Sequence, residues 1–363
     1  MTPFERDLVE TIVLNGPMSV ESYMARCLSY YYGSRDPLGA SGDFTTSPEI
    51  SQMFGELIGL WAAETWRLMG EPVQVHWVEL GPGRGTLSSD AMRAARLLPP
   101  FVKALDVHLV ETSPVLRESQ KQALAGSGLT VTWHDDIGSL PDGPLLIVAN
   151  EFFDALPVRQ FQADGGLWRE RCVGLNEDGK TLRFGLFPTE GVSLSLPPDD
   201  GKMLEVPVSG VSLMKELATR ITRQRGAALL IDYGYRGPAY GDTLQALRQH
   251  QYTGMLDTPG EADITAHVDF QYLASAAGDT GACIHGLQTQ GAFLAALGIE
   301  TRASMLANAA PQEAASIAAA LKRLAGNDTG DMGDLFKVMA VSSRELRELP
   351  GLSACATPIL HSP

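Results

Sequence analysis

The stretch Val78-Glu79-Leu80-Gly81-Pro82-Gly83-Arg84-Gly85-Thr86 decides the fold that we expect for this chain. It joins an apolar segment, which predicts a β-strand, to a segment with helical periodicity. Glycines at such a turn let the backbone pass close to a ligand, with the N-terminus of the next helix beneath it. A glycine-rich turn also occurs in tight connections that bind nothing, so the surrounding sequence must support a site.

Strands and helices alternate along the chain after this stretch. Strands are predicted at 73–80, 106–110, 129–133, 145–149, 227–231 and 335–341, and helices at 86–98, 113–124, 213–221 and 290–297. This alternation predicts right-handed βαβ units and a doubly wound parallel α/β sheet. The segment at 145–149 is apolar throughout, as a central parallel strand should be.

Other segments interrupt this alternation and suggest how the chain is divided. Ser47, followed by Pro48, is predicted to cap a helix. A glycine-rich loop at 33–46 is so long that we expect it to be either a lid or disordered. Period-two alternation at 158–187 predicts inserted antiparallel hairpins. We therefore expect five parts along the chain. They are an N-terminal helical part (1–70), the first half of the sheet (71–157), inserted hairpins (158–205), the second half of the sheet with a loop-rich insertion at 234–285 (206–349), and a tail (350–363).

Composition excludes several classes of protein. The 363 residues carry a formal charge of −15, which argues against broad binding of nucleic acid. No apolar run is long enough for a membrane span, so we expect no membrane insertion. The four cysteines are scattered and form no metal or redox motif. The first 25 residues are acidic and resemble neither a signal nor a transit peptide, which predicts a bacterial cytoplasmic protein.

The glycine spacing distinguishes between two classes of nucleotide ligand. The dinucleotide fingerprint G-x-G-x-x-G would place a glycine or small residue at Thr86, so transfer of a hydride is the weaker interpretation. Glu79, Gly81, Gly83 and Gly85 instead form the spacing E-x-G-x-G-x-G of S-adenosylmethionine-dependent methyltransferases. A carboxylate suits a ligand with an ammonium and a sulfonium better than one with a pyrophosphate.

Acidic residues after the next two strands complete the predicted cofactor site. Glu111 can accept the ribose hydroxyls, although it could also be a solvated acid beside a helix cap. His134-Asp135-Asp136-Ile137 follows the third strand. There Asp135 or Asp136 can bind the adenine amine and Ile137 can pack on the ring, although such acid pairs are also common in surface turns.

The segment Asn150-Glu151-Phe152-Phe153-Asp154-Ala155-Leu156-Pro157 follows the fourth strand, where an open α/β sheet binds its ligands. Asn150 and Glu151 are therefore expected at the transferred methyl group. A guanidinium is a poor nucleophile until carboxylates orient it and help it to lose a proton, and Glu151 with Asp154 could do this. Alternatively, Asp154 caps a helix and both phenylalanines belong to the core.

With these residues in view, the sequence resembles the MidA-type family, the mitochondrial complex I assembly methyltransferases and their bacterial relatives. The matching blocks extend over nearly the whole chain: 42–49, 79–85, 150–157, 232–235, 263–270 and 288–291. The resemblance implies a Rossmann-like class I methyltransferase fold with a seven-strand sheet, and S-adenosylmethionine as the donor. It also implies dimethylation of an arginine in a core subunit of respiratory complex I, which makes a protein the expected partner.

The resemblance adds candidates that spacing alone would not select. The block at 42–49 would fold over the cofactor, which makes Asp43, Thr45 and Ser47 candidate contacts. His267 could take a proton as a neutral imidazole, although a lone histidine is more often structural. Asp232 ends the fifth strand at the expected rim of the substrate pocket. Two other functions stay open: methylation of a small molecule or another nitrogen, and a non-catalytic assembly factor whose cofactor stabilises its fold.

Overall fold

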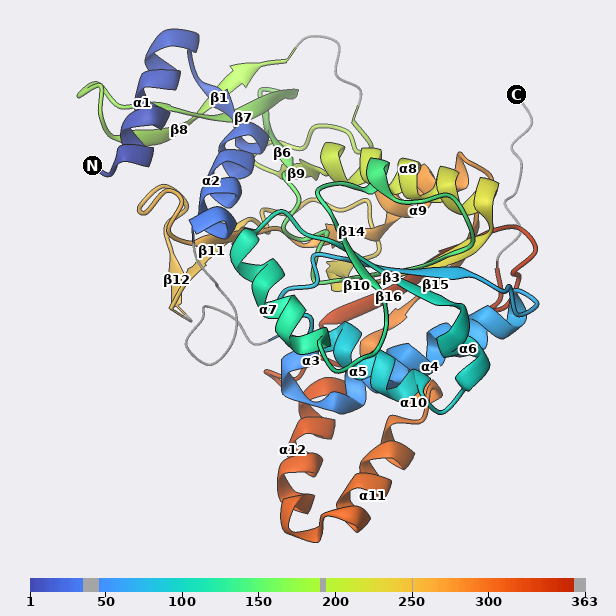
Figure 1. Cartoon of the computed structure of the whole chain (residues 1–363). Coiled ribbons are helices and arrows are strands. Elements are labelled where there is room, and N and C mark those ends of the chain that lie inside the picture. Colours follow the sequence, from blue (N-terminus) through green and yellow to red (C-terminus); the bar gives the residue numbers. More distant parts are fainter. Residues whose placement is uncertain (35–45, 190–193, 250, 356–363) are drawn as a thin grey trace.

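The computed structural model describes residues 1–34, 46–189, 194–249 and 251–355 (Figure 1). Its main sheet has the strand order β15-β16-β10-β5-β2-β3-β4, and all but β16 run parallel to β10. The strands are β2 (Val75–Leu80), β3 (Leu105–Val110), β4 (Val131–His134), β5 (Leu145–Asn150), β10 (Gly226–Tyr235), β15 (Cys283–Thr289) and β16 (Phe336–Ser342). The predicted doubly wound α/β sheet is confirmed, except that β16 runs antiparallel where parallel strands were expected. A short strand β14 (Val268–Asp269) extends the sheet beside the end of β10.

The strand order reverses between β2 and β5. The chain moves from β2 to β3 on one side of the sheet, and from β5 to β10 on the other. Ligands of open α/β sheets bind outside the carboxyl ends of the strands at such a reversal. The register pairs Leu80 with Ala149, so the glycine loop and the segment after β5 begin side by side.

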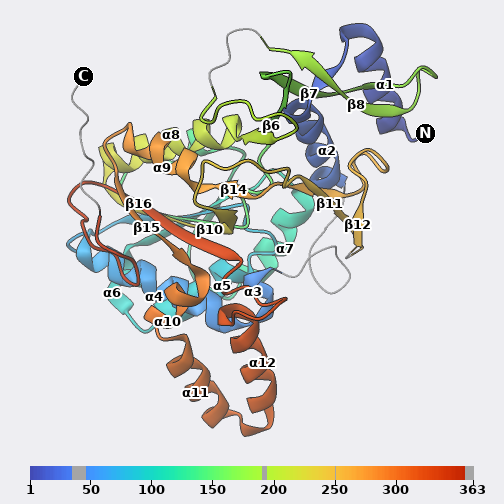
Figure 2. The ribbon, with the colours of Figure 1, turned by 180° about the vertical axis from the view of Figure 1, so that it is seen from behind.

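Helices cover both faces of this sheet (Figures 1 and 2). Alternate side chains of β5 point to opposite faces of the sheet: Leu146 and Val148 pack in one core cluster, and Ile147 packs in the other. The first cluster includes α4 (Gln52–Leu68), α5 (Thr86–Ala95), α6 (Pro99–Ala104), α7 (Pro114–Leu124) and α10 (Gln290–Ala296). The second includes α8 (Val208–Gln224) and α9 (Phe270–Gly278). Among the described residues, no helix has the length and apolar character to cross a bilayer.

The inserted residues form two further sheets. The predicted hairpins at 158–187 are present as antiparallel strands in a sheet of β1 (Met18–Ser19), β6 (Arg159–Asp164), β7 (Leu167–Leu175), β8 (Leu182–Pro188) and β9 (Met203–Val206). Residues 234–285 differ from the expected loop. They hold a three-stranded sheet of β11 (Gln245–Arg248), β12 (Gln251–Thr253) and β13 (Asp263–Thr265), followed by β14, α9 and the start of β15.

The N-terminal helices pack on the inserted sheets. Helices α1 (Pro3–Asn15) and α2 (Val20–Ser34) share a third hydrophobic cluster with β7 and β13, which includes Leu8, Tyr23, Val173 and Ile264. Figure 1 shows this group of elements beside the carboxyl ends of the central strands. Helix α2 thus forms a wall next to the reversal point.

The prediction that Ser47 caps a helix is wrong. Ser47 is the first residue of a four-residue helix α3 (Ser47–Ile50), and Thr46 precedes it without a side-chain hydrogen bond to the helix. The chain becomes extended at Ser51, whose hydroxyl accepts a hydrogen bond from the N–H of Met53 and caps α4 instead. The sequence has a capping residue at both places, and only packing decides between them.

Two helices that the sequence analysis did not assign project together from the sheet (Figures 1 and 2). They are α11 (Ile299–Ala309) and α12 (Ala314–Ala325). Arg302 on α11 donates from Nε and Nη2 to the two carboxylate oxygens of the buried Glu56 on α4, at 2.7 and 3.0 Å. Arg93 also donates to Glu56, at 3.0 Å. This network attaches the projecting pair to the core.

We expect Arg302→Ala to lower the free energy of unfolding by about 1–3 kcal/mol, because it removes a two-bond partner from a buried carboxylate. Urea unfolding measures this change. Arg67→Ala, which breaks an ion pair between exposed side chains, is the control and should change the free energy by less than about 0.5 kcal/mol. Equal effects of the two variants would contradict the anchoring role of Arg302.

Candidate active site

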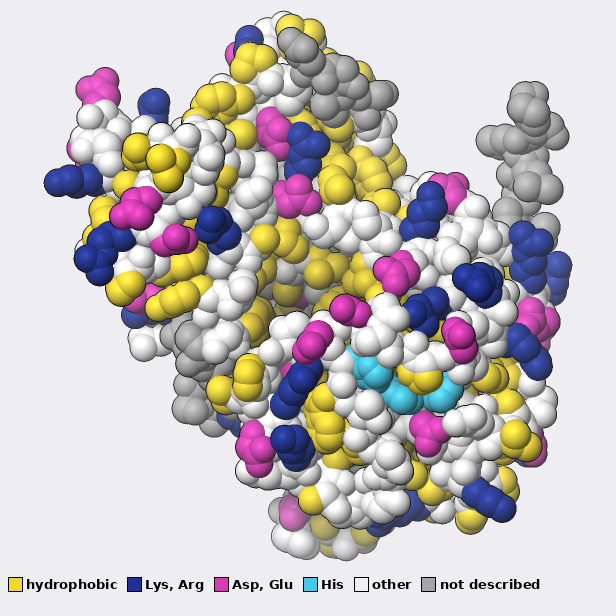
Figure 3. Space-filling model, turned by 45° about the horizontal axis from the view of Figure 1, so that its top comes forward, with side chains coloured by type: hydrophobic (Ala, Val, Ile, Leu, Met, Phe, Trp, Pro, Cys, Tyr) yellow, Lys and Arg dark blue, Asp and Glu magenta, His cyan; other side chains and the backbone are white. Residues whose placement is uncertain are grey.

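A cavity of about 540 Å³ lies at the carboxyl ends of β2, β3 and β5. Its volume is within the range of about 300–1,000 Å³ that is usual for small-molecule sites. Figure 3 shows a hollow in this face of the molecule, with hydrophobic side chains inside it. Helices α2 and α3 also contribute to the lining. Seven of the predicted site residues line the cavity: Glu79, Gly81, Gly83, Glu111, Asp135, Asn150 and Glu151.

The three glycines of the loop after β2 all adopt positive φ angles, of 60°, 53° and 82° at Gly81, Gly83 and Gly85. A Cβ atom at Gly81 would lie 2.7 Å from Cδ2 of Phe152, so the glycine loop packs directly on the segment after β5. Gly85 lies outside the cavity lining. It precedes α5 in the left-handed conformation, and a Cβ there would approach Gln120 to 3.2 Å.

Glu79 is buried at the end of β2 and borders the cavity. The Ser88 hydroxyl donates a hydrogen bond to Glu79 Oε2, and Nε1 of Trp77 donates to Ser88 Oγ at 2.9 Å. Burial raises the pKa of Glu79 to about 8, although the hydrogen bonds from Ser88 act against this rise. The cavity therefore has a carboxyl group whose ionised form a bound cation would stabilise.

Glu111 occupies the equivalent place at the end of β3. Its Oε1 accepts the N–H of Ser113 at 2.7 Å and its Oε2 accepts Nε2 of Gln120 at 3.2 Å, so the carboxyl group is held firmly. Burial raises its pKa. Its backbone oxygen accepts two hydrogen bonds from Arg117, which also pairs with Asp135 at 2.6 Å.

The remaining adenine-site candidates lie outside the cavity lining. Asp136 Oδ1 accepts the N–H of Ser139 at 3.0 Å and caps the short 3₁₀ turn Ile137–Ser139. Ile137 is buried in the core cluster with α8 and α9. Of the three residues predicted to meet the adenine, the structure brings only Asp135 to the cavity.

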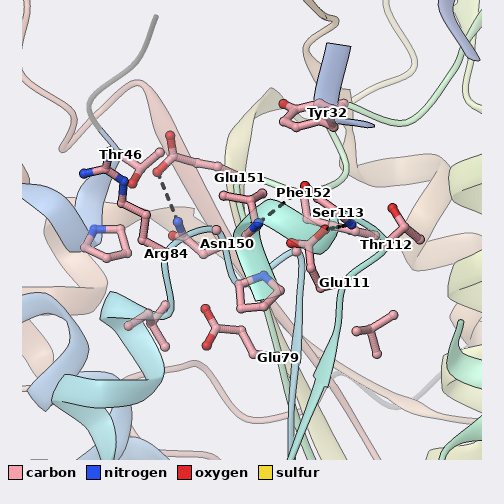
Figure 4. A pocket seen from close by; sticks show the side chains of 18 of the residues that line it. Tyr32, Thr46, Glu79, Arg84, Glu111, Thr112, Ser113, Asn150, Glu151 and Phe152 are labelled. Carbon is pink, nitrogen blue, oxygen red and sulfur yellow. Dashed lines mark hydrogen bonds between the residues drawn. The ribbon is translucent and has the colours of Figure 1, made fainter. Parts of the chain in front are cut away.

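Asn150 and Glu151 end β5 and begin the next segment (Figure 4). Glu151 has a positive φ of 51°, which is rare for a residue with a side chain. Its Oε1 accepts the backbone N–H of Ser47 and Nδ2 of Asn150, each at 3.0 Å. Burial raises the pKa of Glu151 to about 7. Oδ1 of Asn150 has no hydrogen-bond partner among the described residues, although it is buried at the cavity.

Asp154 and His267 lie outside the cavity lining. Asp154 is buried, and burial together with Asp232, Asp263 and Glu151 raises its pKa well above the usual range. The ring of His267 stacks beside Tyr233 with 6.4 Å between centroids, and burial lowers its pKa.

The block at 42–49 is only partly described. Asp43 and Thr45 lie outside the described residues. Ser47 is buried outside the cavity lining, and its backbone N–H donates a hydrogen bond to Glu151. Of the two phenylalanines, Phe152 borders the cavity and Phe153 is buried in the core.

Sequence reasoning missed Tyr32, which reaches the cavity from α2. Its hydroxyl donates towards both carboxylate oxygens of Asp263, at 3.1 and 3.0 Å. No local motif marks Tyr32, because its place depends on the packing of α2 against β13. Among the described residues, no group of three or more His, Cys, Asp and Glu side chains could hold a metal ion.

Comparisons with known proteins agree with this geometry. A family model described as a putative S-adenosyl-L-methionine-dependent methyltransferase matches residues 57–288. The mitochondrial protein arginine methyltransferase NDUFAF7 of Danio rerio is 38% identical over 330 residues, which cover 83% of this chain and 78% of that protein. The human protein of the same name is 38% identical over 336 residues, covering 84% and 76%.

A solved structure has a fold similar to that of this chain. It is a likely methyl transferase from Burkholderia thailandensis bound to S-adenosyl-homocysteine, with a TM-score of 0.85 and 27% identity. The match covers 96% of this chain and 93% of that one.

The prediction of a bacterial cytoplasmic location is wrong. The curated relatives at 35–38% identity carry mitochondrial names. The prediction was based on the acidic composition of the first 25 residues, which does not report where related proteins act.

The raised pKa of Glu79 predicts how stability depends on pH. The folded protein keeps a proton up to about pH 8 that the unfolded chain releases near its ordinary 4.5. The stability that this proton contributes is complete below pH 4.5 and is lost as the pH rises to 8, by up to about 1.4 kcal/mol per pH unit. In Glu79→Gln this loss is absent. Urea unfolding should therefore show that the free energy of unfolding of the variant, relative to that of the wild type, increases between pH 5 and 8. The exposed substitution Glu118→Gln is the control, and a pH-independent difference for Glu79→Gln would refute the assignment.

Proposed function

This chain belongs to the family of S-adenosyl-L-methionine-dependent methyltransferases whose model matches residues 57–288, and on this basis we propose that it methylates arginine side chains of a protein. The curated relatives are named protein arginine methyltransferases, which supports this acceptor. The observation that carries the proposal is the pair formed by Glu151 and Asn150. At the cavity, a carboxyl group with a raised pKa lies beside an amide oxygen that has no hydrogen-bond partner in the part of the chain that the structure describes.

The donor fits the other end of the cavity. S-adenosylmethionine supplies a methyl group on a positively charged sulfur, next to an α-ammonium and an adenosine. We propose that Glu79 and the backbone of Gly81 and Gly83 hold the amino-acid part, and that Glu111 accepts the ribose hydroxyls. Raised pKa values at Glu79 and Glu111 favour a cationic ligand over a pyrophosphate, because the ligand's charge stabilises the ionised carboxylates.

Glu151 and Asn150 would hold the acceptor. A guanidinium offers several N–H donors in one plane, and two acceptors side by side suit this geometry. Ionised Glu151 would bind and orient the guanidinium, and Oδ1 of Asn150 would accept a further N–H. Most of the rate would come from holding the nitrogen in line with the methyl group.

A core subunit of respiratory complex I is the protein substrate that we propose to test first, because the family resemblance implies it. The test is incubation of the purified protein with methyl-labelled S-adenosylmethionine and the isolated subunit, followed by acid hydrolysis and amino-acid analysis. Label in methylarginine supports the proposal. Label only in a metabolite or in another amino acid favours a different N-methyltransferase, and no transfer despite donor binding favours a non-catalytic assembly factor.

Glu151→Gln is expected to lower kcat by about 10²–10⁴-fold, because an amide cannot pair with the guanidinium charge or take its proton. Glu111→Gln is the matched control. It should raise the KM for the donor by about 10-fold and change kcat much less, since Glu111 belongs to the donor end of the cavity. A Glu151→Gln variant with full kcat would exclude the proposed role.

The wild-type enzyme should also show an acidic limb in its pH profile. Only ionised Glu151 can hold the guanidinium, so kcat/KM should rise with pH up to about 7, the pKa to which burial raises this group, and then level off. Initial rates between pH 5.5 and 8.5 measure this. A profile that is flat from pH 5.5 to 7.5 would contradict the assignment.

A further inference from the structure

Asp232 has an unusual set of hydrogen bonds. It lies near the carboxyl end of β10 and is 1% exposed. Its Oδ2 accepts three successive backbone N–H groups, those of Phe152, Phe153 and Asp154, at 3.2, 2.9 and 3.2 Å. Its Oδ1 accepts the N–H of Tyr233 at 2.9 Å. Asp232 is absent from the cavity lining, so it differs from the rim residue that the sequence suggested.

These hydrogen bonds fix the chain immediately after Glu151. Three consecutive N–H groups can point at one oxygen only when the backbone curls tightly, and the curl begins at the positive φ of Glu151. A left-handed conformation at such a residue costs about 1–3 kcal/mol and persists only when its surroundings hold it. The N–H of Glu151 also donates to the carbonyl oxygen of Ile231 at 2.9 Å. Strand β10 therefore holds this segment on both sides of the curl.

The same curl places Phe152. Its ring packs on Gly81 of the glycine loop so closely that no Cβ would fit there. Thus the carboxylate of Asp232 determines where two groups of the cavity lie: the carboxyl group of Glu151 and the ring of Phe152.

Repulsion between acidic groups acts against an aspartate at this place. Burial and the nearby Glu151 raise the pKa of Asp232 against the effect of its backbone hydrogen bonds, and Asp232 in turn raises the pKa of Asp154. An asparagine would avoid this repulsion between acidic groups. It would also turn an NH₂ group towards the N–H groups on one side, where only an acceptor can bond.

We propose that Asp232 is a positioning residue for methyl transfer, which holds Glu151 at the acceptor and Phe152 against the donor loop through the backbone N–H groups of residues 152–154. This inference rests on the proposed function for the role of Glu151. It assigns Asp232 no contact with substrate or cofactor.

The test compares Asp232→Asn with Asp269→Asn. Asp269 is also buried, at 3% exposed, and accepts backbone N–H groups of Gln271 and Tyr272 at the start of α9, away from the cavity lining. Both variants should lose thermal stability. Asp232→Asn should lower kcat at least 10-fold, whereas Asp269→Asn should keep the wild-type kcat. Asp232→Ser is a second variant, in case the amide prevents folding, with the same expected loss of kcat.

Hydrogen exchange provides a readout that needs no acceptor substrate. In the full-length protein with S-adenosylhomocysteine bound, the amides of residues 152–154 should exchange at least 10-fold faster in Asp232→Ser than in the wild type, because the serine hydroxyl cannot replace the oxygen that accepts all three. The exchange of these amides should be unchanged in Asp269→Asn. Unchanged exchange, a wild-type kcat in Asp232→Asn, or equal kcat losses in the two asparagine variants would overturn the inference. If the wild type does not methylate arginine, the proposed function fails, and the exchange measurement still decides whether Asp232 holds the segment.

Discussion

Burial of carboxyl groups at the carboxyl ends of neighbouring parallel strands is the constraint on which this site depends. Glu79 lies near the end of β2 and Asp232 near the end of β10, whereas Glu111 and Glu151 directly follow β3 and β5. Burial raises the pKa of each of these groups, because a charge away from water is unfavourable without a partner. Three of these groups, those of Glu79, Glu111 and Glu151, line the cavity, which is therefore suited to a positively charged ligand.

The strand reversal makes this arrangement possible. Because β2 and β5 are adjacent and their crossovers leave in opposite directions, the segments that follow them diverge and leave space between them. The two segments still touch at one point, where Phe152 packs on Gly81. The donor loop and the acceptor segment therefore share a packed contact, so a change in one affects the other. Elements distant in sequence, α2 and α3, supply the outer wall.

Local sequence patterns predicted the parts of the fold that depend on local physics. The alternating strands and helices and the glycine loop required no knowledge of packing. Ser47 could not be assigned correctly, because Ser51 offers an equivalent cap four residues later. The role of Asp232 could not be predicted from the sequence either. A strand-end aspartate is visible in the sequence, but its three backbone partners lie 78–80 residues away and meet it only because β10 pairs with β5.

Proton release on donor binding most directly tests the central claim, which is that the carboxyl groups lining the cavity bind a cation. Calorimetric titration with S-adenosylmethionine at pH 7, repeated in buffers with different ionisation enthalpies, gives the number of protons exchanged. If Glu79 is protonated in the free protein and ionised beside the donor, close to one proton should be released per donor bound, and Glu79→Gln should release fewer. Tight binding with no proton released, unchanged by that substitution, would contradict the claim.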